Sequence, residues 1–344
     1  MKRSFITGHI QNNNGLIPII STNYELADIL GAIMVRWGIN RNKYRVSPGL
    51  YAVGDPDDSS EVFVTANYKL SFDHLRKNLA EMNCWILVLD TKGINVWCAA
   101  GKGTFGSEEL VKKIHDVSLG NIVKHRRIIL PQLGATGVAV HKVREESGFN
   151  VHFGPVRASD IKRYIDDGYR ATREMRRVTF SFNDRLKLVP NDFMFGILYL
   201  LGASALLFLI SFIRNEGTVS EGPVRNGLRT IMNIFLAYSA GIIITPLALP
   251  YLPGRRFSMK GFISGAVVAV ILLLACRTGY SIYEKIAWFM IITAISSFMA
   301  MNFTGSSTYT SLSGVKKEMK TAVPLQIIFS LLGIILLVVC KFLN

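Results

Sequence analysis

The sequence predicts an α/β domain with a largely parallel sheet, followed by an all-α domain of five transmembrane helices. In the first half of the chain, short apolar runs alternate with amphipathic stretches, the pattern of strands joined by right-handed helical crossovers. The second half contains five long apolar segments, and apolar residues make up 50% of the 344 residues. Together these two observations favour one globular domain attached to a membrane domain.

The first predicted helix follows Thr22-x-x-Glu25, which has the spacing of a capping box, and it ends near Gly38. Its apolar residues recur at helical spacing, so we expect them to pack in the core. They are Leu26, Ile29, Leu30, Ile33, Met34 and Trp37.

Strands and helices then alternate along the chain. The predicted strands are 62–65, 85–90, 127–130 and 150–153. The predicted helices are 71–82, 107–117, 136–147 and 159–167. In the helix at 107–117, Glu108 and Glu109 occupy the first turn, and Lys112 and Lys113 stand four residues later, which suits the helix dipole and i,i+4 pairing.

A turn at 91–93 and a short helix at 95–102 follow the second of these strands. The helix carries Cys98 beside Trp97, and the next three residues have little side-chain bulk, so a flat molecule could lie against it. A lone cysteine is often a buried apolar residue. Cys98, however, follows a strand and stands near Lys102 and a helix start, which is the setting of reactive thiols, and thiolates bind soft metals.

The sequence Asn-Val-Trp-Cys-Ala-Ala-Gly-Lys at 95–102 resembles the signature of the HgcA family, the corrinoid membrane proteins of microbial mercury methylation. Residues 44–182 resemble the corrinoid domain of the corrinoid iron–sulfur protein, through segments 64–70, 130–135 and 154–157. The membrane half is similar in architecture only. One departure is Glu61, where the family pattern leads us to expect proline.

The resemblance implies a Rossmann-like corrinoid-binding domain in which the helix at 95–102 caps the corrin ring. It implies that Cys98 is the catalytic residue, whose thiolate ligates the cobalt from below, and that Asn95 helps to set the turn. The implied cofactor-binding residues lie at or after the ends of predicted strands, at the edge where open α/β sheets bind ligands. They are Thr65, Asn67, Asn95, Val96, Trp97, Cys98, Ala99, Ala100, Gly101, Lys102, Gln132, Leu133, Gly134, Gly154 and Pro155.

The implied function is corrinoid-dependent methyl transfer to Hg(II), which produces methylmercury. The cysteines at 84, 98, 276 and 340 show no C-x-x-C spacing, so we expect neither disulfides nor an iron–sulfur cluster in this chain. The resemblance therefore implies a ferredoxin-like iron–sulfur partner of the HgcB type as electron donor. It also implies a methyl donor system linked to methyltetrahydrofolate.

Two alternatives stay open: a membrane-anchored corrinoid-binding or transport module, and a methyl carrier to another acceptor. Nucleotide hydrolysis is disfavoured, because Val96 and Gly103 stand where a P-loop needs glycine and Ser or Thr. The G-x-G-x-x-G at 101–106 is a weak signal, since it does not directly follow a strand. No D-x-H-x-x-G sequence is present to supply a histidine ligand to cobalt.

The predicted domains are 1–168 (soluble), 169–192 (basic linker) and 193–344 (membrane). The apolar segments are 193–213, 228–249, 259–280, 286–303 and 323–343, and prolines at 246 and 250 are expected to end the second one early. Basic residues cluster before the first segment, which by the positive-inside rule indicates the cytoplasmic side of the membrane. Although the net charge is +15, we expect these residues to interact with anionic lipid headgroups rather than with nucleic acid. They are Arg170, Arg173, Arg176, Arg177, Arg185 and Lys187.

The topology follows from the basic loops. The second loop (Arg255, Arg256, Lys260) and the fourth (Lys316, Lys317, Lys320) are placed on the cytoplasmic side with the soluble domain. We therefore expect a multi-pass protein of the cytoplasmic (inner) membrane, without a signal peptide and with its C-terminus outside. Apart from Glu284 at a loop edge, no acidic residue lies within a span, which disfavours a proton pump.

Overall fold

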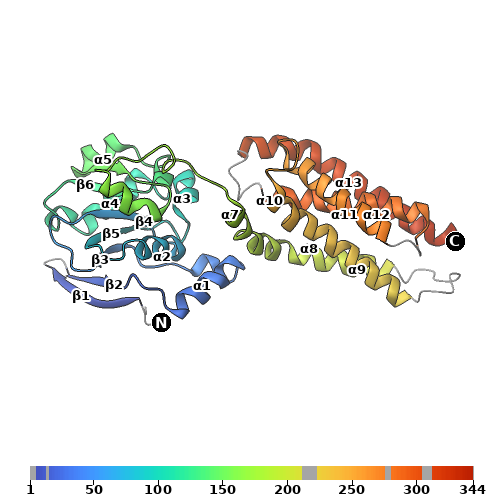
Figure 1. Cartoon of the computed structure of the whole chain (residues 1–344), viewed down its shortest axis with the longest axis horizontal. Helices are drawn as coiled ribbons and strands as arrows, with labels where there is room; N and C mark the ends of the chain where they lie inside the picture. The colour runs from blue at the N-terminus through green and yellow to red at the C-terminus, as the bar shows by residue number, and fades with distance from the viewer. Residues whose placement is uncertain (1–4, 13–14, 211–222, 276–279, 304–311, 344) are drawn as a thin grey trace. The chain divides into compact units, whose positions relative to one another are not determined.

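The structure is a computed structural model that describes residues 5–12, 15–210, 223–275, 280–303 and 312–343. The chain divides into two compact units: residues 1–35 and 39–179 form the first, and residues 180–344 together with residues 36–38 form the second. The first unit is an α/β domain and the second is helical (Figure 1). Segment 169–179, which the sequence assigned to the linker, belongs to the first unit.

The first unit contains a mixed sheet of seven strands in the order β1-β2-β3-β5-β4-β6-β7 within the described residues. Strands β5, β4, β6 and β7 are parallel to one another, which confirms the predicted parallel sheet. The bounds are β1 Ile6–Asn12, β2 Gly15–Ile20, β3 Gly49–Val53, β4 Val62–Ala66, β5 Cys84–Leu89, β6 Arg127–Leu130 and β7 Asn150–Phe153.

The sequence did not predict β1, β2 or β3. Strands β1 and β2 form an antiparallel hairpin, and β3 pairs antiparallel with β5. Pro18 lies in β2, although proline lacks the N–H that a strand ladder needs. It is tolerated because β2 joins β3 only through Ile19 and Ile20.

Helices cover both faces of the sheet (Figure 1). Helices α3 (Val96–Lys102), α4 (Ser107–Asp116) and α5 (Val140–Ser147) share one core with Trp85, Leu87 and Leu89 of β5. Helices α2 (Lys69–Lys77) and α6 (Ile161–Asp166) share the other with Cys84, Ile86 and Val88. Successive residues of a strand point to opposite faces, so β5 supplies both cores.

Three predicted helices are shorter than expected. Helix α2 stops at Lys77, where Asn78 Nδ2 donates to the carbonyl of His74 at 2.7 Å. Helix α5 begins at Val140 rather than 136, because the 3₁₀ turn η3 (Gln132–Gly134) and the turn after it occupy the preceding residues. Helix α6 follows a separate 3₁₀ turn, η4 (Ala158–Asp160).

Helix α1 (Leu26–Arg36) contradicts the prediction that its apolar stripe packs in the core. All six predicted core residues are exposed, while Asp28, on another face, is only 3% exposed. The reason is electrostatic: Asp28 accepts from Lys69 Nζ at 2.6 Å and from Arg76 Nη2 at 2.7 Å, so the acidic face must turn inward. The predicted capping box is also wrong, since the N–H of Glu25 bonds to Asp28 Oδ2 instead.

Glu61, the departure from the family pattern, has a structural role. Its carboxylate pairs with Arg127 at the start of β6, and Tyr169 Oη donates to it at 2.6 Å. Burial, together with this hydrogen bond to a carboxylate, raises the pKa of Tyr169 to about 12. Met175 accepts from the N–H of Val156 at 2.8 Å. These contacts attach residues 169–175 to the sheet.

Among its described residues, the second unit has five helical segments that are long and apolar enough to cross a membrane, as predicted: 182–210, 224–248, 257–275, 282–302 and 313–340. Its helices are α7 Phe182–Leu186, α8 Val189–Ile210, α9 Pro223–Ser239, α10 Thr245–Ala248, α11 Phe257–Ala275, α12 Ile282–Asn302 and α13 Leu312–Leu343. Residues 211–213 and 276–279 of the predicted segments, with Cys276, lie outside the described residues.

Three expectations for this unit are corrected. Lys316, Lys317 and Lys320, which were expected in the fourth loop, lie within α13. The second segment does not end before Pro246 but continues through it to Ala248. A π-helical turn, η5 (Ala240–Ile244), precedes the proline, and this local change in hydrogen bonding accommodates a residue that has no N–H to donate. Lys260 is not in a loop: it lies in α11, is buried, and its Nζ donates to the carbonyls of Leu249 and Leu252. It thereby satisfies carbonyls of the turn that follows α10.

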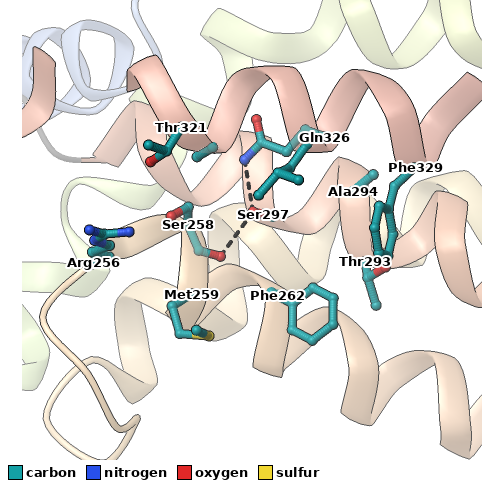
Figure 2. A pocket seen from close by; sticks show the side chains of 12 residues that line it. Arg256, Ser258, Met259, Phe262, Thr293, Ala294, Ser297, Thr321, Gln326 and Phe329 are labelled. Atoms are coloured by element: carbon teal, nitrogen blue, oxygen red, sulfur yellow. Dashed lines mark hydrogen bonds between the residues drawn. The ribbon is translucent and has the colours of Figure 1, made fainter. Parts of the chain in front are cut away.

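Small residues bring α11 against α12. A Cβ added to Gly261 or Gly265 would come within 2.5 Å of Ala300 Cβ or 2.7 Å of Ser296 Cβ, so the G-x-x-x-G spacing permits this close packing. Nearby, a cavity of about 280 Å³ opens between α11, α12 and α13. Figure 2 shows the polar chain at its wall, in which Gln326 Nε2 donates to Ser297 Oγ at 2.8 Å and Ser297 donates to the carbonyl of Ser258 at 2.9 Å.

Candidate functional site

The predicted site residues follow the carboxyl ends of the four parallel strands. Segment 67–68 follows β4, segment 90–95 follows β5, segment 131–139 follows β6, and segment 154–157 follows β7. Since the strands are parallel, the four segments leave the same edge of the sheet. Ligands bind at this edge in open α/β sheets.

The side chain of Asn67, in the segment after β4, forms hydrogen bonds to the segment after β5. Its Oδ1 accepts from the N–H of Thr91 at 3.2 Å, from Thr91 Oγ1 at 2.9 Å and from the N–H of Gly93 at 2.9 Å. Its Nδ2 donates to Asp90 Oδ1 at 3.0 Å. Asn67 is buried, so its side chain holds the turn at 90–93 in place. The neighbouring Thr65 is buried in β4.

The turn delivers Asn95 to the start of α3. Asn95 is the N-cap residue, and its Oδ1 accepts from the N–H of Cys98 at 2.9 Å. Gly93 has φ +75°, and a Cβ there would approach the carbonyl of Asn42 to 3.3 Å. Asn95 therefore fixes the first turn of the helix that carries Cys98.

Helix α3 has one buried face and one open face. Val96, Ala99 and Ala100 are buried against the core of the first unit. The open face of α3 is formed by Trp97, Cys98, Gly101 and Lys102, which are exposed. A Cβ added to Gly101 would meet no atom within 4 Å, so the surface is open at that position. The thiol of Cys98 thus stands on a helical face with little bulk beside it.

The end of α3 rests on the segment after β6. Gly103 ends the helix with φ +81°, and the carbonyl of Ala99 accepts from the N–H groups of Thr104 and Phe105 at 3.0 and 3.1 Å. The Phe105 ring is buried, and a Cβ added to Gly134 would come within 2.6 Å of it. At Gly137, an added Cβ would come within 3.0 Å of Ala100 Cα. These glycines let η3 approach α3.

The other predicted residues lie on the side of β6 and β7. The N–H of Gly154 donates to the carbonyl of Leu130 at 2.8 Å, and Gly154 and Pro155 are buried. Leu133 is half-buried against the core. Among the described residues, Gln132 Oε1 has no hydrogen-bond partner although the atom is buried. A buried acceptor without a donor is rare in folded proteins.

The predicted residues therefore fall into two groups. An accessible group forms the open face of α3, and a buried or half-buried group supports it from the inner face of α3 and from the strand ends. The turn at 91–93 was predicted, but three supporting features were not: the hydrogen bonds of Asp90 and Thr91 to Asn67, the packing of the Phe105 ring, and the close approach at Gly137. Thr91 and Phe105 carry no chemical signature of their own, so only their position in the fold identifies them.

The first unit holds two cysteines in opposite environments. Cys84 is buried in β5, and burial, with a smaller effect of the Glu61 charge, raises its pKa to about 12. Its thiol is therefore protonated and inert at neutral pH. Cys98 is exposed. Of these two thiols, only Cys98 is accessible to a ligand.

Asn67→Ala is expected to destabilise the first unit by about 1–3 kcal/mol, because the part-buried N–H of Gly93 would lose its side-chain acceptor and Thr91 and Asp90 would lose their hydrogen bonds to the same side chain. Urea unfolding of the full chain in detergent, followed by proteolysis, measures the change. Amide hydrogen exchange at 90–95 should also rise. Asn78→Ala is the control, since it removes a single exposed hydrogen bond and should stay within about 0.5 kcal/mol. Equal effects of both variants would contradict the role of Asn67.

Residues 18–165 match the family described as CO dehydrogenase/acetyl-CoA synthase delta subunit (CdhD), which is less than half of the chain. The chain is 35% identical over 148 residues to the acetyl-CoA decarbonylase/synthase complex subunit gamma of Methanocaldococcus jannaschii, covering 42% of this chain and 30% of that protein. The subunit gamma of Methanopyrus kandleri is 31% identical over 128 residues, covering 37% of this chain and 27% of that protein.

The corrinoid/iron-sulfur protein large subunit of Moorella thermoacetica is 33% identical over 119 residues, covering 34% of this chain and 26% of that protein. The chain therefore spans less than a third of the length of these relatives. The family match includes β3 to β7 and the open face of α3, and it ends before the helices of the second unit begin.

Proposed function

We propose that the first unit binds a corrinoid and transfers its methyl group to Hg(II), with the Cys98 thiolate as the lower ligand of the cobalt. The observation that carries this proposal is the open face of α3, where an exposed thiol stands beside a position without a side chain. A thiolate is a suitable ligand for a soft metal. The similarity of residues 18–165 to corrinoid-protein relatives supports the same assignment.

The residues present fit a flat, polar-edged cofactor. The side of α3 that bears Cys98 has open space at Gly101, so a planar ring meets no backbone obstacle there. Gln132 Oε1 lacks a donor in the described residues, and the amide groups at the edge of a corrin could supply one. Trp97, which is 41% exposed, offers apolar area next to the thiol.

When bound, the corrinoid would supply the methyl group held on cobalt, and it would need electrons from outside this chain. The chain's own residues perform the other tasks. Asn95 fixes the helix start that presents Cys98, and Asn67 holds the turn below it. Ala99 and Ala100 seat α3 on the core, and Gly134 lets Phe105 pack under that helix. Lys102 places a positive charge at the rim of the open face.

The remaining parts of the proposal concern partners and location. A ferredoxin-like iron–sulfur protein would supply electrons, and a methyltetrahydrofolate-linked system would supply methyl groups. The five apolar helical segments support a multi-pass membrane protein. We propose that the first unit lies on the cytoplasmic side, because basic residues precede the first of these segments.

A graded series at Gly101 tests the proposed site. Gly101→Ala should retain corrinoid binding, since nothing lies within 4 Å of the added Cβ and alanine favours helix. Gly101→Leu should leave the fold intact but weaken binding of methylcobalamin more than about tenfold, because the longer side chain would occupy the space of the ring. The measurement is equilibrium binding to the full chain in detergent, followed by visible absorption.

Each outcome has a defined meaning. If the leucine variant binds methylcobalamin as tightly as wild type, the ring does not lie on α3 and the proposed site is wrong. If wild type binds the corrinoid but forms no methylmercury from Hg(II), a corrinoid-binding module or a methyl carrier to another acceptor replaces the mercury proposal. If wild type binds no corrinoid, the whole proposal fails.

A further inference from the structure

Helix α1 and the turn after it present a continuous apolar surface to the outside. Seven residues of this surface are between 43% and 71% exposed. We call them the apolar face of α1: Leu26, Ile29, Leu30, Ile33, Met34, Trp37 and Ile39. Those within the helix are three, four and seven residues apart, so they lie on one side of it. Such a surface marks an interaction site when it is contiguous.

The orientation of α1 is fixed, so this face is not available to the core of the first unit. Asp28, on another side of the helix, forms buried ion pairs with Lys69 and Arg76 at 2.6 and 2.7 Å. Val35 is buried, and Gly31 lies so close to Tyr44 that an added Cβ would be 2.6 Å from its hydroxyl oxygen. Turning the apolar face inward would expose Val35 and bring an unpaired Asp28 to the outside, which is costly.

The segment that follows the helix is cationic. Between Ile29 and Val46 the chain contains Arg36, Arg41, Lys43 and Arg45 and no acidic residue. Lys43 and Arg45 are exposed. An amphipathic helix with aliphatic residues and a tryptophan on one side, and with cations next to it, has the chemistry of helices that lie in the interface of a bilayer. Anionic headgroups complement these cations.

We propose that the apolar face of α1 lies in the interfacial layer of a lipid bilayer, with the cations after the helix at the anionic headgroups. The second unit provides the reason for lipid as the occupant, because its five apolar segments bring the chain to a membrane. The residues of the face also carry no carboxylate, amide or hydroxyl with which a protein partner could fix a register. The proposal does not depend on the reaction proposed for Cys98.

Two tryptophans of nearly equal exposure provide a matched test. Trp37 is 43% exposed on the apolar face of α1, and Trp97 is 41% exposed on the open face of α3. The full chain is placed in liposomes of phosphatidylcholine and phosphatidylglycerol, with ordinary or brominated acyl chains. The emission of each tryptophan is the difference between wild type and Trp37→Phe, or between wild type and Trp97→Phe.

The expected result is that brominated lipid removes at least half of the Trp37 emission and leaves the Trp97 emission unchanged. Replacing phosphatidylglycerol by phosphatidylcholine should weaken the quenching of Trp37, because the cations lose their headgroup partners. Trp37 emission that is equal in both lipids would overturn the proposal. A blue-shifted but unquenched Trp37 would also overturn it, and would assign the face to a protein partner or a second copy of the chain.

Discussion

Cys98→Ala is expected to lower methylmercury formation by more than about a hundredfold. Residues that only hydrogen-bond to metal ligands already change metal affinity or activity by roughly 10–100-fold, and this variant would remove the ligand itself. Because Cys98 is exposed, its loss leaves no cavity in the core, so the fold should persist. The measurement is methylmercury produced in a single turnover from Hg(II) by the full chain loaded with methylcobalamin.

Cys84→Ala is the matched control, since it removes the other thiol of the first unit. Cys84 is buried in the opposite core and does not reach the open face of α3. Its loss should reduce stability by a small cavity cost and leave methyl transfer within about twofold of wild type. The visible spectrum of the bound corrinoid should change in Cys98→Ala only. Full activity in that variant, or the same loss in both variants, would remove Cys98 from the mechanism.

The four strands that form the site edge were predictable, because three are short runs of mainly apolar residues and β7 alternates polar and apolar residues. The predicted bounds match the structure to within one residue at each end. β1 contains Gly8 and β2 contains Pro18, residues that are unusual within strands, so neither sequence alone predicts a strand. The antiparallel hydrogen bonding between β1 and β2 in the structure is what identifies both as strands. Residue spacing correctly predicted α1 to be a helix with an apolar face. We expected that face to pack in the core, but in the structure it is exposed. The direction of this face depends on the ion pairs of Asp28 with Lys69 and Arg76, which lie 41 and 48 residues away.

In the candidate site, too, the features that depend on neighbouring residues were predictable, whereas the contacts between residues distant in the sequence were not. The turn, the N-cap Asn95 and the short helix at 95–102 follow from neighbouring residues, and the structure contains them. The resemblance to corrinoid proteins grouped Asn67 with the cofactor contacts. In the structure its side chain bonds to the turn after β5, a strand that follows 17 residues later in the sequence. Only the pairing of β4 with β5 brings the two together.

Arg76→Met is expected to destabilise the first unit by about 3–5 kcal/mol, the range for removing one partner of a buried ion pair. The side chain of Arg76 is fully buried. It donates to Asp73 Oδ1 at 2.8 Å, to Asp28 Oδ2 at 2.7 Å, and to the carbonyls of Ser21 and Asn23 at 2.5 and 2.9 Å. Methionine fills much of the volume but leaves all four acceptors without this donor. Urea unfolding of the full chain in detergent, detected by proteolysis of the first unit, measures the loss.

Two further variants separate charge from packing in this measurement. Lys77→Met changes the next residue of α2, which is exposed, and should alter the free energy of unfolding by no more than about 0.5 kcal/mol. Adding Asp73→Asn to Arg76→Met should recover part of the lost stability, because one uncompensated buried charge is then removed. If the double variant is less stable than Arg76→Met by the full cost of Asp73→Asn alone, the two groups do not interact as proposed.

The pH dependence gives an independent check on the same cluster. Burial by itself raises the pKa of Asp28, but hydrogen bonds from Lys69, the N–H of Glu25 and Arg76, with the charge of Lys69, together hold it below its usual value of 3.8.

A carboxyl with a lowered folded pKa contributes stability above its unfolded pKa, and this contribution is lost as pH falls through the folded pKa. Wild type should therefore lose it only below about pH 4. In Arg76→Met, the loss of the Arg76 hydrogen bond raises the pKa of Asp28 above its wild-type value, so the buried carboxylate takes up its proton at a higher pH than in wild type. The difference in unfolding free energy between the two proteins should therefore be largest at pH 7 and shrink as pH approaches 4, whereas a difference that is constant with pH would mean that the loss comes from packing alone.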